Sequence, residues 1–327
     1  MTAPRLPKVA AGCFAACLSS CLFLPCLQAA EGGIAAYAPG SFASFMDALP
    51  PQPGFAVFNY FAYYNGKADV SHSFPIAGQI GVNVEATTYV DVPGAFWVTP
   101  LQLAYGHYAV GVSIPITWNT VSAEVTGPSG GTLGHGDSAN GLGDIEFWPL
   151  AIAWGALGGD LHVTFFGGVY APTGDFQKNR LANQGLNYWT LEPGVIASYL
   201  NQKNGLEGTT YIAYDFNTTN SATDYHSGQV FHIDATLAWH FIPLGKKGGV
   251  IGIGANGFYL QQTTGDSGSG ARLGPFKEAQ AGVGPVLSWA AQFGKIGVAL
   301  SLKWLPQIAT DNTLKGNFVW AKAGVTF

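Results

Sequence analysis

The stretch FHIDATLAWHF, from Phe231 to Phe241, indicates the fold of this chain. It alternates between two rows of side chains: an apolar row at positions 231, 233, 235, 237, 239 and 241, and a more polar row of His232, Asp234, Thr236, Ala238 and His240. Successive side chains of a β-strand point to opposite faces, so this pattern predicts a strand with one apolar and one polar face. Its length, about ten residues, is what a tilted strand needs to cross a hydrocarbon layer.

The same period of two recurs at residues 80–91, 296–304 and 319–327. After residue 30 no segment offers the ~18 consecutive apolar residues of a membrane-spanning helix. Amphipathic strands also build soluble sandwiches, with the apolar face inward. Three features favour the membrane: strands longer than a sandwich uses, aromatic residues such as Trp239 and Trp304 near strand ends, and the terminal Phe327.

The alternating segments predict an all-β fold, a transmembrane antiparallel β-barrel of about twelve strands. We expect these strands at residues 55–64, 79–92, 108–119, 142–154, 161–171, 188–200, 209–217, 229–241, 249–263, 276–292, 296–307 and 317–327. An even number leaves both termini on the periplasmic side, with long loops outside and short turns inside. FWVTPLQL, residues 96–103, is not counted because Pro100 lies in its middle.

The first thirty residues form a domain of their own. Arg5 and Lys8 precede an apolar run that ends at Ala29 and Ala30, which is the order of a secretory signal peptide with cleavage after either alanine. A membrane anchor and a lipid attached to Cys21 are the alternatives. All four cysteines lie in this segment, so the mature chain has no disulfide and no thiolate metal site. Residues 31–53 form a lead that either is flexible or folds into the barrel lumen, and residues 54–327 form the barrel.

Charge is scarce, at 10% of residues, and the formal net charge is −5. No basic cluster is present, which excludes nucleic acid as a partner. In a barrel, charges on the lipid face cost ~2 to 4 kcal/mol near the midplane, so the acidic residues of the strands are predicted to face the lumen. Either they pair with Lys, His and hydroxyl groups, or they make the lumen electronegative and unfavourable to anions.

Two stretches, GLGDIEFWPLAIAW at residues 141–154 and YAPTGDFQKNRLANQGLNYWTLEP at residues 170–193, resemble the bacterial outer-membrane family of putative phenol meta-pathway degradation proteins, also described as transporters. The resemblance covers nearly all of the mature chain. It implies a barrel that is linked by genetic association to the uptake of aromatic or other hydrophobic compounds, and it brings no catalytic residues.

The expected function is a porin-like outer-membrane channel for small, hydrophobic or aromatic solutes. Its lumen and substrate path are predicted from acidic residues of the strands, from Lys303, from lumen-side tyrosines and from the polar loop after residue 171: Glu85, Asp144, Glu146, Tyr170, Asp175, Arg180, Asn183, Asn187, Tyr188, Glu192, Asp234 and Lys303. We expect Asp175, Lys178 and Arg180 to form ion pairs that fold this loop inward, with Asn183 and Asn187 supplying hydrogen bonds. A solvated outer loop is the alternative.

Two other function classes stay open: an outer-membrane enzyme that modifies lipid, and a structural or adhesive barrel. The adjacent His226 and Ser227 are too little for a catalytic site, since no third residue is placed by spacing. No metal motif or dinucleotide fingerprint is present, so we predict no catalytic residues, no metal and no cofactor. The expected partners are outer-membrane lipid, the barrel-assembly machinery through Phe327, and the solute.

Overall fold

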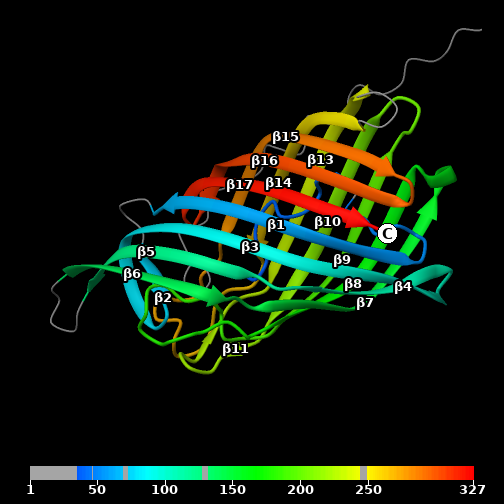
Figure 1. Cartoon of the computed structure of the whole chain (residues 1–327). Coiled ribbons are helices and arrows are strands. Elements are labelled where there is room, and N and C mark those ends of the chain that lie inside the picture. Colours follow the sequence, from blue (N-terminus) through cyan, green and yellow to red (C-terminus); the bar gives the residue numbers. More distant parts are fainter. Residues whose placement is uncertain (1–34, 46, 69–72, 127–131, 244–248) are drawn as a thin grey trace, which may run out of the picture.

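A computed structural model describes residues 35–45, 47–68, 73–126, 132–243 and 249–327. The predicted signal peptide, with Cys21, Ala29 and Ala30, lies outside the described residues. The strands wrap around one axis as a tilted barrel (Figure 1). They are β1 (Gly54–Lys67), β2 (Ser73–Ile76), β3 (Gln79–Leu103), β4 (Gly106–Ser113), β5 (Ile116–Thr126), β6 (Thr132–Leu142), β7 (Ile145–Ala156), β8 (Leu161–Ala171), β9 (Thr190–Leu200), β10 (Leu206–Asn217), β11 (Thr219–Asn220), β12 (Tyr225–His226), β13 (Val230–Pro243), β14 (Val250–Gln262), β15 (Ala279–Phe293), β16 (Ile296–Asp311) and β17 (Lys315–Thr326).

The barrel closes because β1 pairs antiparallel with both β17 and β3. Two barrel strands are interrupted once: β4 continues as β5 after Pro115, and β6 continues as β7 after Asp144. Strand β5 pairs with β3 and with β6, and β4 pairs with β7, which in turn pairs with β8. Counted in this way the wall has twelve antiparallel strands, which confirms the predicted barrel. The FWVTPLQL segment is the end of β3 and not a separate strand.

The two ends of the barrel differ in the length of their connections. At one end the turns are short; between β3 and β4, Ala104 and Tyr105 both have positive φ, as the two central residues of a tight type I′ hairpin require. At the other end lie residues 172–189, 218–229 and 263–278. Both barrel termini are at the short-turn end, where the amide of Phe55 donates to the carbonyl of Phe327.

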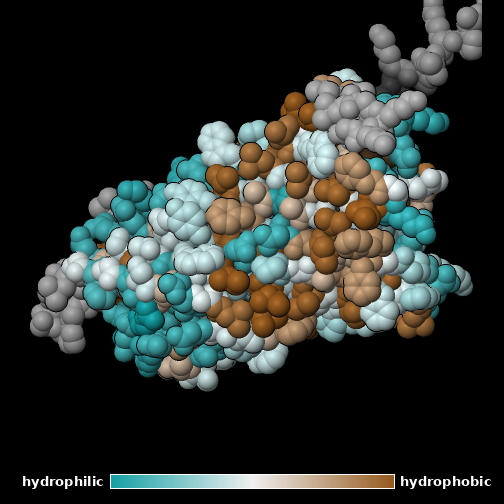
Figure 2. All heavy atoms as spheres, viewed as in Figure 1, coloured by the Kyte–Doolittle hydropathy of each residue, from teal (hydrophilic) through white to brown (hydrophobic). Residues whose placement is uncertain are grey.

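The outer surface carries an apolar belt between two more polar ends (Figure 2). In β13 the predicted apolar row faces outward, with Leu237 64% and Trp239 56% exposed, while His232 and Asp234 on the other row are fully buried. Leu302 and Trp304 of β16 are likewise half exposed. An exposed apolar belt is stable only in contact with lipid, so these side chains position the barrel in a membrane. Among the described residues, no helix has the length and apolar character to span a bilayer.

Strand β3 has the reverse orientation to the one predicted. Its apolar residues Val84 and Ala86 are buried in the barrel, whereas Glu85, Tyr89 and Asp91 face outward. The prediction of Glu85 in the lumen is therefore wrong. The barrel interior beside β3 is apolar, so the apolar row has a better place inside than outside. Glu85 lies near the long-loop end, where it forms an exposed ion pair with Lys67 at 2.7 Å.

Candidate functional site

The barrel interior is occupied by residues 35–45 and 47–49, which we call the inner segment. It runs through the lumen before the chain enters β1, and Tyr37, Ala43 and Leu49 are almost fully buried there. A segment without regular secondary structure must find partners for its backbone polar groups when it is buried. The inward-facing polar side chains of the barrel strands provide them.

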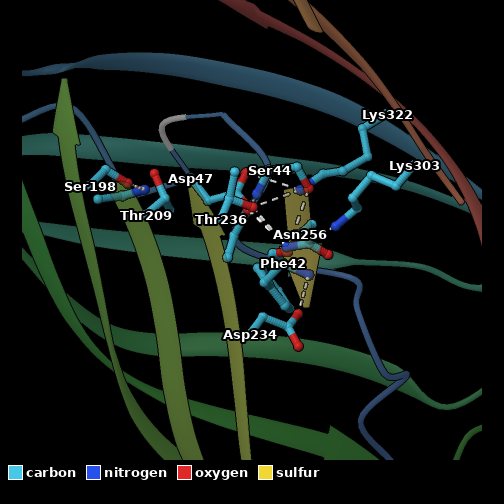
Figure 3. A network of polar contacts seen from close by, with 12 residues as sticks. Phe42, Ser44, Asp47, Ser198, Thr209, Asp234, Thr236, Asn256, Lys303 and Lys322 are labelled. Atoms are coloured by element: carbon cyan, nitrogen blue, oxygen red, sulfur yellow. Dashed lines mark hydrogen bonds and ion pairs between the residues drawn. The ribbon is translucent and has the colours of Figure 1, made fainter. Parts of the chain in front are cut away.

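One set of contacts comes from Asp234 of β13 and Lys303 of β16 (Figure 3). The carboxylate of Asp234 accepts hydrogen bonds from the Tyr37 hydroxyl and, at 2.9 Å, from the amide of Phe42. The ammonium group of Lys303 donates to the carbonyls of Gly40 and, at 2.9 Å, of Phe42. An acid and a base on opposite sides of the segment thus satisfy its amides and carbonyls.

A second set holds the end of the inner segment nearest β1. Lys322 of β17 forms a buried ion pair with Asp47, 2.9 Å from each carboxylate oxygen. Hydroxyl groups of the wall accept the next two amides, Ser198 from Ala48 at 3.1 Å and Thr164 from Leu49 at 2.8 Å. The segment is therefore attached to several strands around the barrel.

Stacked rings connect the inner segment to the wall. The ring of Phe42 lies parallel to that of Tyr211, with centroids 4.2 Å apart, and Phe166 is next to Tyr211 at 5.3 Å. Trp148 continues the stack against Phe166 at 4.1 Å. Such ring pairs stabilise a fold by ~0.5 to 1.5 kcal/mol each beyond the area they bury. Here they join the inner segment to β7, β8 and β10.

A cavity of about 340 Å³ lies between the inner segment and the long-loop end. Its wall comes from the inner faces of β1, β3 and β5 and its far side from the loop after β8. Most of its lining is aliphatic or aromatic, including Phe58, Val84, Ala86, Val90, Phe96, Val121, Leu181, Leu186 and Phe318. The cavity is large enough for a small organic molecule.

Two carboxylates are the charged groups among the described residues that line this cavity. Glu146 accepts bonds from Ser113 at 2.8 Å and from the Trp148 indole at 2.5 Å. Asp144 accepts the amides of Gly174 and Leu186 at 2.9 and 2.7 Å, and so connects the wall to the loop after β8. Both carboxyl groups accept hydrogen bonds from protein donors. No basic residue is among the described residues that line the cavity, so this side of the cavity is acidic.

The loop after β8 closes over the cavity, but its ion pair differs from the predicted one. Arg180 binds Asp137 of β6 at 3.0 Å, and Asp175 is an exposed residue whose backbone carbonyl accepts two amides of the loop. The bond from Arg180 lowers the pKa of Asp137 to about 2. The predicted pairing within the loop is therefore wrong, because the upper end of β6 extends beside the loop and presents a better partner.

The remaining predicted residues fall into three places. Tyr170, Asn183 and Tyr188 line the cavity. Glu192 is fully buried behind Tyr170, whose hydroxyl is 3.2 Å from it. Asn187 donates to Asn220 at 2.6 Å and joins two loops.

Several residues of the site were missed by the sequence. Tyr37, Phe42 and Asp47 lie in a lead whose location the sequence left open. Val84 and Ala86 were assigned to the lipid face because an apolar row in a barrel strand normally faces lipid. The small side chain of Ala86 at mid-strand was the available signal in the sequence that this face borders a cavity.

The family model described as "Putative MetA-pathway of phenol degradation" matches residues 67–323, nearly all of the barrel. The chain belongs to this family. A search of curated proteins found no significant match.

The barrel is also similar to solved structures. The COG4313 outer membrane channel from Pseudomonas putida F1 superposes with a TM-score of 0.62 at 10% identity, over 88% of this chain and 100% of that one. The β-domain of the Bordetella autotransporter BrkA gives a TM-score of 0.44 at 12% identity, over 84% of this chain and 99% of that one. At these identities the likeness to the first of them establishes the fold alone, the closed antiparallel β-barrel of that channel.

Proposed function

We propose that the protein is an outer-membrane channel for small hydrophobic solutes, aromatic compounds among them. The observation that carries this proposal is the apolar cavity inside the barrel, between the long-loop end and an inner segment that lies in the lumen. Water-filled porins have wide polar lumens, whereas this lumen offers a solute-sized apolar compartment. The phenol degradation named in the family description agrees with an aromatic solute.

The charge of the cavity favours neutral solutes over anions. Asp144 and Glu146 line it, and no Lys, Arg or His is among its described lining residues. A carboxylate solute would be placed in an apolar space beside acidic groups and without a counter-ion, which is costly. We therefore expect toluene or phenol to pass in preference to benzoate.

We also propose outer-membrane lipid and the barrel-assembly machinery as partners, and the outer surface supports both. The apolar belt is suited to outer-membrane lipid, and β17 is followed directly by Phe327, a residue that is 59% exposed. An exposed terminal aromatic on the closing strand is available to the barrel-assembly machinery. Deleting Phe327 should lower the yield of barrel in the outer membrane, as measured by fractionation and heat-modifiable migration. An unchanged yield would contradict this partner.

A cavity-filling substitution tests the channel. Ala86→Trp places an indole in the cavity, and Ala95→Trp places the same indole on the other face of β3, where an aromatic is tolerated at the lipid surface. Uptake of radiolabelled toluene by cells that depend on this protein should fall several-fold with the first variant and stay unchanged with the second. Equal uptake by both variants, each shown to be folded, would refute passage through the cavity.

The selectivity is measured in the same cells. Uptake of toluene and benzoate is compared at neutral pH, with and without the protein. A protein-dependent preference for benzoate would refute the proposed discrimination, and a preference for toluene would support it.

A further inference from the structure

A second polar cluster lies in the lumen, on three neighbouring strands. It consists of Glu192 of β9, Asp215 of β10 and His232 of β13, and all three are fully buried. The Nε2 atom of His232 is 3.1 Å from Oδ1 of Asp215 and 3.4 Å from Oε2 of Glu192. One ligand-capable atom from each residue lies within 4.8 Å of those of the other two.

The charges of this cluster do not balance within it. Two carboxylates face one imidazole, so that even a protonated His232 would offset one of two negative charges. In the same lumen Asp47 has Lys322 as a direct partner. The second oxygen of Asp215, Oδ2, has no hydrogen-bond partner although the residue is fully buried. Burying an uncompensated ion costs several kcal/mol, so the excess negative charge has to be neutralised, either by a proton on one carboxyl group or by a bound cation.

Two of the three separations between the ligand atoms fit a metal ion. A tetrahedral ion with bonds of ~2.0 to 2.1 Å to nitrogen and oxygen separates its ligand atoms by roughly 3.3 Å. The observed 3.1 and 3.4 Å agree with this value. One imidazole and two carboxylates suit zinc-like divalent ions, whereas Ca²⁺ takes six to eight oxygen ligands and Mg²⁺ requires an octahedron.

We propose that Glu192, Asp215 and His232 form a binding site for a divalent transition cation of the zinc class.

The surroundings of the cluster hold these ligands in place. The hydroxyl groups of Tyr211 and Tyr170 both donate to Glu192, which fixes the orientation of its carboxylate. Hydrogen bonds from such neighbours are a regular part of metal sites. The ring of Tyr37 in the inner segment stacks on the His232 ring at 3.8 Å. A bound cation would fix the His232 ring and with it the surface on which the inner segment rests.

The chain contains a matched control for this site. His240 and Glu207 form another buried pair in the lumen, with 2.6 Å between Nε2 and Oε2. Among the described residues this pair does not belong to a group of three metal-ligating side chains. It therefore shares the burial and the chemistry of the proposed site but lacks its third ligand.

The test measures zinc bound to the full barrel in detergent micelles, stripped with a chelator and then dialysed against Zn²⁺. We expect about one tightly held zinc per chain for wild type and for His240→Gln, by mass spectrometry of the metal content. Asp215→Asn and His232→Gln should bind at least tenfold more weakly by competition with a zinc indicator, because each removes one ligand. Absence of zinc from wild type would overturn the proposal. Zinc retained by Asp215→Asn would place it elsewhere, for example at exposed His135, and would also overturn it.

Heat-modifiable migration in gels confirms that each variant forms a barrel. If a variant does not fold, the visible absorption spectrum of Co²⁺ bound to the wild-type protein tests the proposal instead. Intense visible absorption from a tetrahedral nitrogen and oxygen site supports the proposal, and a spectrum identical to that of hydrated Co²⁺ overturns it.

Discussion

Two sides of the same lumen are built from opposite kinds of side chain. On the side of β9, β13 and β16 the inward residues include Glu192, His232, Asp234 and Lys303, all fully or almost fully buried. On the side of β1, β3 and β5 the inward residues are mainly apolar and surround a cavity. Both sides are hidden from the lipid, so burial alone does not explain the difference.

The two kinds of side chain differ in how they constrain the groups that they contact. Polar groups that are buried must each meet a partner in a defined geometry, and once they are satisfied they fix what they touch. Apolar surfaces make contacts without directional demands, so they accept solutes of various shapes. The polar side thus anchors the inner segment, and the apolar side leaves space that a solute can fill.

Deleting the inner segment, which the polar side holds, should have the largest effect. Deletion of residues 35–49 would empty a twelve-stranded barrel and leave a water-filled lumen, since barrels wider than about eight strands are not filled by their own side chains. We expect single-channel conductance in planar bilayers to rise several-fold. A conductance equal to that of wild type would show that the inner segment does not block the pore.

A single anchor on the polar side should matter less but remain measurable. Lys303→Met keeps the length of the side chain and leaves the carbonyls of Gly40 and Phe42 without their lysine donor. The free energy of unfolding should fall by about 2 to 5 kcal/mol, since each buried carbonyl without a donor costs roughly 1 to 3 kcal/mol. Urea unfolding in liposomes measures this.

Lys67→Met is the matched control for this anchor. It breaks the exposed pair with Glu85 and should cost less than about 1 kcal/mol. Equal losses for Lys303→Met and Lys67→Met would contradict the assignment of Lys303 as an anchor.

The smallest expected effect concerns the loops above the two sides, which should respond to pH in opposite directions. Above the polar side, burial raises the pKa of Asp266 to about 6. The protonated form is therefore favoured in the folded loop, and its contribution is complete below about pH 4 and lost as the pH rises through about 6. Above the cavity, Asp137 has its pKa lowered to about 2 by Arg180, so its contribution is complete above about pH 4 and lost as the pH falls through about 2.

Hydrogen exchange, corrected for intrinsic rates, measures both loops. Between about pH 4 and pH 8 protection should fall in residues 263–278 and stay constant in residues 176–186. Asp266→Asn should weaken the first trend, and Arg180→Gln should reduce protection of the second loop at every pH in this range. Parallel trends in the two loops would contradict the comparison.

The sequence predicted well where one face of a strand meets lipid. In β13 and β16 the apolar rows with Leu237, Trp239 and Leu302 face outward as expected, because the membrane rewards a continuous apolar face. In β3 the same reasoning gave the wrong face. A strand between lipid and an apolar cavity has two apolar environments, and the alternation of Val84, Glu85 and Ala86 does not distinguish them.

What the sequence determined by itself is therefore the barrel. The period of two predicts strands, and the length of these strands indicates that they span a membrane. The even number of strands determines which connections lie at the same end of the barrel. Only the tertiary structure decided what fills the lumen. Contacts such as those of Asp234 with Tyr37 and of Lys303 with Gly40 join residues far apart in the chain, and no local pattern encodes them. The grouping of Glu192, Asp215 and His232 likewise depends on the registers of three strands, so it exists only once the barrel has closed.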